Sequence, residues 1–128
     1  MSLTKRNVSE AEMRILNVLW EHGPATAREV RERLLAKTKL AYSTVITLLQ
    51  RLEIKGAVTH TKSERGKAFI FHPVMKPEQV RQRALASVIK HYFDNDPVPL
   101  FSTLVKTNPL SKEEIKQFRD ILDEAGGK

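Results

Sequence analysis

Residues 41–73 decide the fold, and they read A-Y-S-T-V-I-T-L-L-Q-R-L-E-I-K-G-A-V-T-H-T-K-S-E-R-G-K-A-F-I-F-H-P. In the first part, apolar residues recur at the three- and four-residue spacing of a buried helical stripe, namely Val45, Leu48, Leu49 and Leu52. We expect a helix from Tyr42 to Lys55. It should end at Gly56, because glycine adopts the left-handed conformation of a helix end at little cost.

The second part of this stretch predicts a β-hairpin. Residues 57–62 and 68–73 are rich in β-branched and aromatic side chains, and the S-E-R-G-K between them is typical of a turn. Arg65 and Lys67 lie at its tip. A helix that ends at a glycine and leads into a basic hairpin is the sequence outline of a winged helix-turn-helix, so the stretch points toward DNA.

Two further helices are expected before this stretch. Ser9 with Glu12, and Thr26 with Glu29, form S/T-x-x-E capping boxes, in which a hydroxyl and a carboxylate satisfy backbone N–H groups at a helix start. The first helix should reach Glu21 and the second about Lys37. The short P-A-T-A segment between them, residues 24–27, has the length of a small edge strand.

Three shorter helical segments are expected after the hairpin. Pro77 opens a fourth helix of about four turns, D-N-D-P-V-P at 94–99 breaks it, and the apolar segment 100–105 follows. A third capping box, Ser111 with Glu114, begins the last helix. The predicted fold is therefore mainly α with a small β-hairpin: a winged helix-turn-helix at 1–74 and a C-terminal helical dimerisation domain at 75–128.

The dimer is inferred from size, because helices this few and short form only a marginal core by themselves. Pairing with a second chain solves this and places two recognition helices on a pseudo-palindromic duplex site. The alternative is that these helices fold back on the winged helix of their own chain. The expected interface residues are Leu85, Val88, Ile89, Tyr92, Leu100, Phe101, Leu104, Ile115, Phe118 and Leu122.

The charge of the chain is concentrated in its N-terminal half. Of the 22 Lys and Arg and 15 Asp and Glu, residues 1–73 hold 13 basic and 7 acidic residues, a net charge of +6, whereas residues 74–128 hold 9 and 8, a net charge of +1. A basic half favours a polyanionic partner through counterion release and steering, although many other surfaces are also basic.

The expected DNA contacts lie on the third helix and the hairpin. At 100° per residue, Ser43, Thr44 and Thr47 point away from the buried leucines, and their hydroxyls and methyls suit base edges. The side chains expected to contact phosphates are Tyr42, Arg51, Lys55, Arg65 and Lys67. The alternatives are local capping or a solvent position without a role for each hydroxyl, and for Arg51 a surface ion pair with Glu53 or Glu29.

Catalysis and metal binding find little support in the residues. The four histidines are far apart in the sequence and form no H-x-x-x-H pair, there is no phosphate-cradling glycine loop, and we expect no enzyme activity, cofactor or metal. His60 and His72 could face each other across the hairpin, but we expect them to lack an acidic partner, and such a pair is more typical of solvent-facing strand residues. The absence of cysteine, of a long apolar run and of a signal peptide fits a cytoplasmic protein with no membrane partner.

A family resemblance extends over nearly the whole chain. S-E-A-E-M-R-I-L-N-V-L-W at 9–20, S-T-V-I-T-L-L-Q-R-L-E-I-K-G-A-V at 43–58, the R-G-K-A-F-I-F-H-P wing at 65–73 and L-S-K-E-E-I at 110–115 resemble the penicillinase and methicillin-resistance repressors (BlaI/MecI). The resemblance implies a dimeric repressor that binds operator dyads ahead of resistance or stress genes, with Thr44 and Thr47 reading bases. A protein-interaction module with a winged helix, without specific DNA binding, is the alternative function.

Two departures limit what the resemblance implies. In β-lactam-responsive members a sensor protease system cuts an Asn-Phe bond, and Thr103-Leu104 stands at that place here. Copper-responsive relatives carry a C-terminal cysteine cluster, which this chain lacks, so the soft thiolate ligands of a copper sensor are missing. A sensor protease therefore stays an implied partner, and the operator, the regulated genes and the inducing signal are not specified by the sequence.

Overall fold

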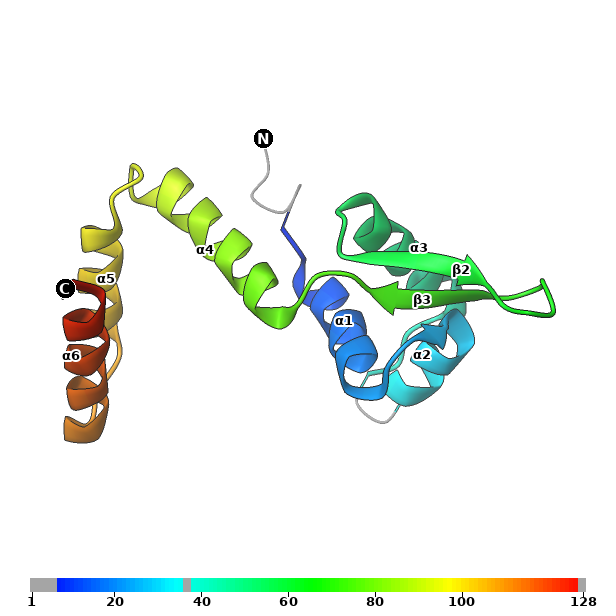
Figure 1. Ribbon diagram of the computed structural model, residues 1–128, viewed down its shortest axis with the longest axis horizontal. Helices are drawn as coiled ribbons and strands as arrows, with labels where there is room; N and C mark the ends of the chain where they lie inside the picture. The colour runs from blue at the N-terminus through cyan, green and yellow to red at the C-terminus, as the bar shows by residue number, and fades with distance from the viewer. Residues whose placement is uncertain (1–6, 36–37, 127–128) are drawn as a thin grey trace. The chain divides into compact units, whose positions relative to one another are not determined.

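The computed structural model describes residues 7–35 and 38–126, which form six helices and one small antiparallel sheet (Figure 1). The elements are, in chain order, α1 (Glu10–His22), β1 (Ala25–Thr26), α2 (Ala27–Leu34), α3 (Tyr42–Ile54), β2 (Val58–Lys62), β3 (Phe69–Pro73), α4 (Pro77–Tyr92), α5 (Pro97–Thr107) and α6 (Lys112–Gly126). They divide into two compact units, Met1–Val88 and Ile89–Lys128. The predicted mainly α fold with a β-hairpin is confirmed.

Capping boxes begin α1 and α2 where the sequence predicted them. The backbone N–H of Glu12 donates to Ser9 Oγ over 3.1 Å, and the backbone N–H of Ser9 donates to Glu12 Oε1 over 2.9 Å. Thr26 and Glu29 repeat this exchange over 3.2 and 2.9 Å. Each box satisfies two N–H groups that have no partner inside the helix.

Helices α2 and α3 both end earlier in the structure than the sequence predicted. The structure ends α2 at Leu34, whereas the sequence predicted Lys37, which lies outside the described residues. Helix α3 ends at Ile54, one residue before its predicted end. Gly56 follows with a φ of +81°, so the expected left-handed glycine is confirmed and reverses the chain into β2.

The sheet has the strand order β1-β3-β2, so the predicted edge strand is present and joins the hairpin as its third strand. Ala25 of β1 pairs with Phe71 of β3, and on the other side Phe71 pairs with His60 of β2. His72 pairs with Thr59, so His60 and His72 do not face each other across the hairpin.

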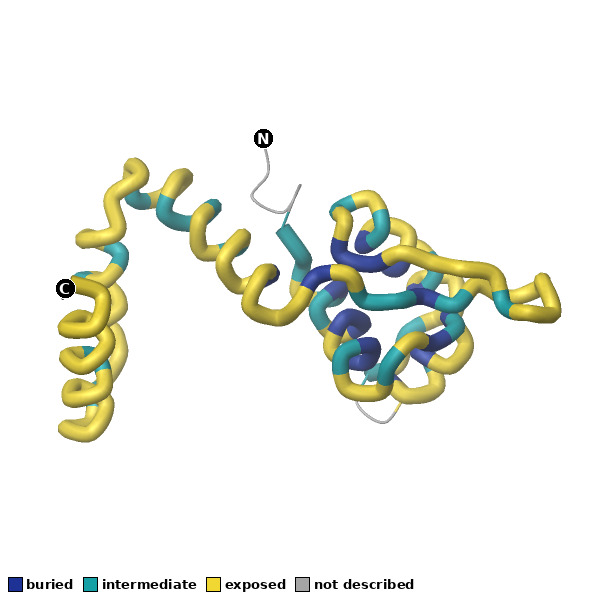
Figure 2. Tube along the Cα trace, viewed as in Figure 1, coloured by how far each residue is buried: buried dark blue, intermediate teal, exposed yellow. Residues whose placement is uncertain are grey.

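One hydrophobic core lies between the three N-terminal helices and the sheet (Figure 2). Its fully buried large side chains come from each of these helices at the predicted helical spacing, since such a spacing puts one stripe of each helix against its neighbours. They include Ile15, Leu16, Leu19, Val30, Val45, Leu49 and Leu52. Phe71 adds the inner face of the sheet, so the core holds α3 in place with its other face outward.

Three contacts attach the start of α4 to this core. The indole N–H of Trp20 donates to the carbonyl of Met75 over 2.9 Å. Val80, in the first turn of α4, is buried in the core cluster. One turn later, Arg83 Nη1 donates to the carbonyl of Lys55 over 3.2 Å. The first turns of α4 are thus packed on the winged helix.

The two compact units and the two predicted domains differ in where they place α4. The sequence predicted the domain boundary between residues 74 and 75, where the hairpin ends, but the compact N-terminal unit continues to Val88. The prediction grouped α4 with the C-terminal helices, which it expected to pair with a second chain. Val80 is buried in the core of the N-terminal unit, so the first turns of α4 pack within that unit.

The C-terminal unit consists of the end of α4, α5 and α6. The Asp96 carboxylate accepts the backbone N–H of Val98 over 3.0 Å and begins α5, so the apolar segment 100–105 lies inside a longer helix than predicted. Ser111 and Glu114 form the expected capping box of α6. None of the described residues 89–126 of this unit is buried (Figure 2).

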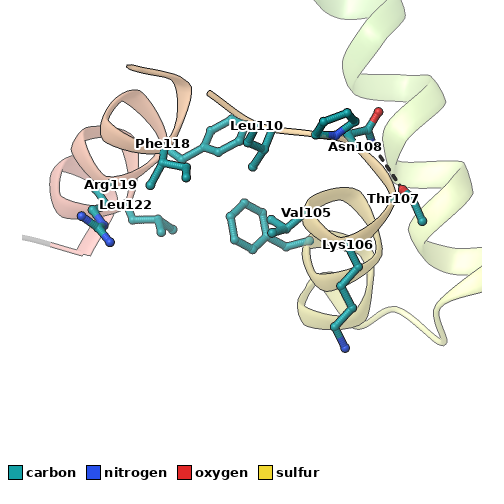
Figure 3. Close-up of a pocket in the computed structure, with 11 residues that line it drawn as sticks. Val105, Lys106, Thr107, Asn108, Leu110, Phe118, Arg119 and Leu122 are labelled. Atoms are coloured by element: carbon teal, nitrogen blue, oxygen red, sulfur yellow. Dashed lines mark hydrogen bonds between the residues drawn. The ribbon is translucent and has the colours of Figure 1, made fainter. Parts of the chain in front are cut away.

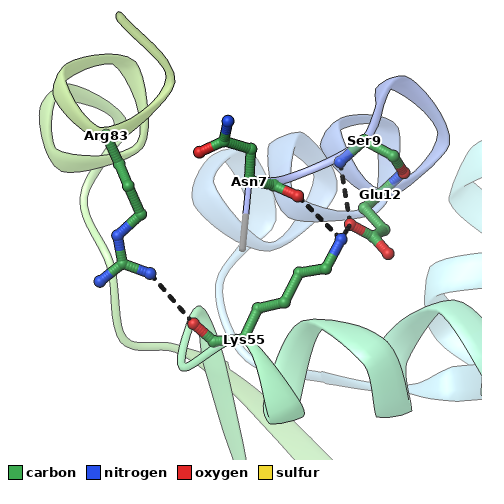
Figure 4. A network of polar contacts seen from close by, with 5 residues as sticks. All are labelled: Asn7, Ser9, Glu12, Lys55 and Arg83. Carbon is green, nitrogen blue, oxygen red and sulfur yellow. Dashed lines mark hydrogen bonds and ion pairs between the residues drawn. The ribbon is translucent and has the colours of Figure 1, made fainter. Parts of the chain in front are cut away.

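An ion pair is buried between α1 and the end of α3 (Figure 4). Lys55 Nζ lies 2.7 Å from Glu12 Oε1 and donates to the carbonyl of Asn7 over 2.8 Å. The Glu12 side chain is 2% exposed and the Lys55 side chain 12%. Because both charges have left water, each depends on the other for its stabilisation.

This pair predicts a large effect of removing either partner. Replacing Glu12 with alanine leaves the buried Lys55 ammonium without its carboxylate, and we expect the free energy of unfolding to fall by about 3 to 5 kcal/mol. Lys55→Met keeps the apolar stem but strands the carboxylate, with a loss of the same order. Urea denaturation measures both.

The control is Glu10→Ala, two residues earlier in the same helix turn. Glu10 pairs with Arg14 at 3.6 Å, but its side chain is 90% exposed, so we expect a change within about 0.5 kcal/mol. Equal losses for Glu10→Ala and Glu12→Ala would contradict the assignment of a buried, structural pair.

Candidate nucleic-acid interface

The outward face of α3 is lined by small polar side chains. Ser43, Thr44 and Thr47 are all exposed, on the side opposite the buried leucines. Thr47 Oγ1 donates to the carbonyl of Ser43 over 3.0 Å, so this hydroxyl keeps its lone pairs as acceptors and its methyl for an outside partner. The structure therefore brings the three predicted base-reading residues together.

The N-terminus of α3 is held by a contact that the sequence did not indicate. Arg31 Nε, on α2, donates to the carbonyl of Leu40 over 2.9 Å and so fixes the segment that leads into α3. Ala41 at the N-cap supplies no side-chain acceptor. The first N–H groups of α3 thus remain available to an anion, and Tyr42, which is 51% exposed, lies beside them.

The hairpin β2–β3 forms the wing, which we define as residues 58–73. Its turn is closed by the N–H of Ser63 donating to Ala68 and the N–H of Gly66 donating to Ser63, each over 2.8 Å, with Gly66 at a φ of +76°. Arg65 and Lys67 are exposed at the turn, and in the described part of the chain neither is paired with a carboxylate. Figure 1 shows this turn projecting beyond the two strands.

A side-chain hydrogen bond joins the wing to α3. His60 Nδ1 on β2 lies 2.7 and 2.9 Å from the two carboxylate oxygens of Glu53, in the last turn of α3. The expectation that His60 lacks an acidic partner was therefore wrong. The left-handed turn at Gly56 brings β2 back beside α3, the helix that precedes it. Local sequence patterns do not predict this contact, because it depends on how the turn directs the strand.

The two cations on the C-terminal half of α3 have different environments. Arg51 is exposed, and among the described residues it forms no ion pair with Glu53 or Glu29, so it is free to contact a phosphate. Lys55 was predicted to do the same, but its ammonium is held by Glu12. We correct this prediction: Lys55 is a structural residue, because a phosphate contact would strand a buried carboxylate.

The C-terminal unit carries an open apolar groove between α5 and α6, with a volume of about 730 Å³ (Figure 3). The rings of Phe101 and Phe118 meet edge to face, with centroids 6.0 Å apart. Four of the predicted interface residues line it: Phe101, Ile115, Phe118 and Leu122. The others lie outside the groove on α4 and α5, exposed or half-buried: Leu85, Val88, Ile89, Tyr92, Leu100 and Leu104.

Thr103 and Leu104, which align with the cleaved Asn-Phe of the resembled family, lie inside α5. Thr107 Oγ1 donates to the carbonyl of Thr103 over 2.7 Å and supports the helix at this point. Proteases act most readily on exposed, irregular chain, so cleavage here requires local unwinding of α5.

Neither a metal site nor a membrane span emerges from the described residues. In residues 7–35 and 38–126 no group of three or more His, Asp or Glu side chains is placed to hold a metal ion. Within the same part of the chain, every helix is too short or too polar to cross a bilayer.

An exposed polar helix beside a basic hairpin, both held on one core, defines a winged helix-turn-helix protein. The family model described as "Penicillinase repressor" matches residues 8–124. The chain therefore belongs to the penicillinase repressor family, a family of transcriptional repressors and not of enzymes. This confirms the family resemblance that the sequence motifs indicated.

Individual relatives agree with the family assignment. The chain is 26% identical to the penicillinase repressor of Bacillus licheniformis over 117 residues, which are 91% of this chain and 90% of that protein. It is 36% identical to the transcriptional regulator BlaI of Mycobacterium tuberculosis over 63 residues, which are 48% of this chain and 46% of that protein.

Solved structures agree with the fold. The DNA-binding domain of the repressor BlaI superposes with a TM-score of 0.50 at 30% identity, over 58% of this chain and 88% of that one. The YusO protein of Bacillus subtilis superposes with a TM-score of 0.55 at 20% identity, over 94% of this chain and 76% of that one, which supports the fold alone.

Proposed function

We propose that this chain is a dimeric transcriptional repressor that binds an inverted-repeat operator in double-stranded DNA and has no catalytic activity. The observation that carries the proposal is the exposed polar face of α3 beside a wing whose cations have no partner among the described residues. A related protein, the repressor BlaI, has a solved domain that is described as DNA-binding and shares this fold.

In the proposed complex α3 lies in the major groove, which is wide enough for a helix. Ser43, Thr44 and Thr47 then meet base edges, since they form its exposed and uncharged face. Tyr42 and Arg51, at the two ends of this face, meet phosphates of the flanking backbone. Lys55 is not part of this set, because Glu12 already holds it.

The wing extends the same contact. Arg65 and Lys67 project from its turn, and a cationic turn of this kind suits the phosphates or the narrow minor groove beside the helix. Neither cation is neutralised within the described part of the chain, so both can release counterions from the duplex.

The dimer is proposed from the exposure of the C-terminal unit. None of its described residues is buried, while Phe101, Leu104, Ile121 and Leu122 are between 39% and 60% exposed. A surface this apolar is rarely left uncovered on a soluble chain. A second copy of the chain, which carries the same groove, would cover this apolar surface. The two-fold symmetry of such a dimer then matches a pseudo-palindromic operator. A sensor protease is a further partner, proposed from the family alone.

The first test is the salt dependence of DNA binding. We expect the wild-type chain to bind random-sequence duplex at low salt, with an affinity that falls steeply as salt is added. Arg51→Ala should flatten the slope of log K against log salt by about one unit, and Arg65→Ala with Lys67→Ala by about two, because each phosphate contact releases about 0.9 counterions. Fluorescence anisotropy across a salt series measures these slopes.

Absence of binding even at low salt would overturn the proposal and favour a protein-interaction module. Lys55→Met serves as the internal comparison in this series, because it removes a cation of α3 that we assign to the fold. The slope for its folded fraction should equal that of the wild type.

The second test concerns base reading by Thr47. Thr47→Ala removes the outward methyl and hydroxyl, so we expect base preference at one operator position to change by about 1 to 3 kcal/mol. Thr59→Ala, the same substitution at an exposed position of β2, should leave the selected sequence unchanged. Sequencing of duplexes selected from a random pool compares the two variants, and identical motifs for all three proteins would remove Thr47 from the reading surface.

The third test concerns the dimer. Phe118→Glu with Leu122→Glu places two carboxylates in the groove between α5 and α6, and we expect a monomer in sedimentation velocity. Lys116→Glu, an exposed position of α6 outside the groove, adds the same side chain and should leave the dimer intact. A wild-type chain that sediments as a monomer at micromolar concentration would contradict the proposed dimer.

A further inference from the structure

In the contact between Glu53 and His60, the imidazole is the hydrogen-bond donor and the carboxylate is the acceptor. His60 Nδ1 lies 2.7 Å from Glu53 Oε1 and 2.9 Å from Oε2, and the two side chains are 36% and 35% exposed. An ionised carboxylate only accepts hydrogen bonds, so Nδ1 carries the hydrogen in this contact. Both carboxylate oxygens lie within hydrogen-bond distance of Nδ1, so the contact restrains the orientation of the imidazole ring.

The same imidazole lies against aromatic rings of β3, the central strand of the sheet. Its ring centroid is 4.5 Å from that of Phe69 and 5.7 Å from that of Phe71. Phe71 is buried in the core, whereas Phe69 is 47% exposed and pairs with Lys62 where the strands enter the turn. Covered by His60 in this way, Phe69 is linked to the last turn of α3.

These contacts end at Phe69, which is two residues from Lys67 and four residues from Arg65. Phe69 follows Lys67 closely in the sequence, and the turn between Ser63 and Ala68 is closed by backbone hydrogen bonds. The orientation of the turn is therefore set by the strands that enter it. The Glu53–His60 contact is a side-chain hydrogen bond that joins α3 to these strands.

We propose that Glu53 and His60 are a positioning pair, which holds the wing at the angle to α3 that lets both reach one duplex at the same time. The inference rests on the proposed function, because it assigns these residues to the same DNA-binding surface. Neither side chain contacts DNA in this role. The pair acts through Phe69 on Arg65 and Lys67.

An alternative role of the pair is to mask charge, and it predicts the opposite effect on DNA affinity when Glu53 is removed. If His60 only neutralised a carboxylate beside the phosphates, removing that carboxylate would strengthen binding. If the pair positions the wing, removing the carboxylate weakens binding, because the wing cations lose their place. Glu53→Ala therefore distinguishes the two roles by the sign of its effect.

The experiment measures the salt slope for random-sequence duplex. Without the contact, the wing no longer holds both cations on the backbone, so we expect His60→Ala to lower the slope by about two units, as Arg65→Ala with Lys67→Ala does. The triple variant should show no further decrease. Glu53→Ala should behave as His60→Ala, and Glu53→Gln should retain the wild-type slope, because its amide oxygen still accepts from Nδ1.

The matched control is His72→Ala, on the neighbouring strand of the same wing. His72 Nε2 lies 2.9 Å from Thr61 Oγ1, a contact that joins the two strands to each other but not to α3. We expect His72→Ala to keep the wild-type slope. A slope reduced equally by His72→Ala would indicate that any loosening of the hairpin suffices, and it would overturn the positioning pair.

The outcomes separate this inference from the proposed function. Wild-type slopes for His60→Ala and Glu53→Ala, beside a reduced slope for Arg65→Ala with Lys67→Ala, overturn the inference and leave DNA binding in place. Tighter binding by Glu53→Ala also overturns it, in favour of charge masking. Absence of binding by the wild-type chain overturns the proposed function itself. Thermal unfolding measures whether each variant is folded. If His60→Ala does not fold, the result for Glu53→Ala decides the test.

Discussion

The buried ion pair between Glu12 and Lys55 is the constraint on which the N-terminal unit depends. Glu12 is the charged residue that the core accepts, and Lys55 reaches it from the end of α3 while donating also to the carbonyl of Asn7. The backbone carbonyl of Lys55 in turn accepts Arg83 from α4. Through one residue, the start of α1, the end of the exposed helix and the start of α4 are held together, so the direction of α3 is fixed at its C-terminal end.

Local patterns explain how much of this fold the sequence predicts. The capping boxes, the leucine stripe of α3 and the left-handed Gly56 are features of neighbouring residues, and each lies where it was expected. Lys55 was misassigned because its partner is 43 positions away, and a lysine after a helix has the same local signature whether it faces a phosphate or a buried carboxylate. The length of α5 was underestimated because an aspartate and two prolines lie at its start, and these residues also suit a loop.

The candidate site divides in the same way. The outward face of α3 follows from helical periodicity, so its small polar residues could be identified once the leucines were assigned to the core. Two contacts at this surface could not be predicted in this way, because Arg31 with Leu40 and His60 with Glu53 each join residues from two different parts of the fold. A sequence thus indicates which side chains an element presents. It does not indicate what angle one element makes with the next.

The C-terminal unit has no interior of its own among its described residues. If a second copy supplies that interior, as proposed, the free energy that folds this unit is the free energy of association, and it depends on the concentration of the chain. The fraction of chains with a folded C-terminal unit then depends on how abundant the chain is. At low concentration the unit loses its order and its partner together, so occupancy of a two-part DNA site would rise with abundance more steeply than simple binding allows, without any ligand or conformational switch.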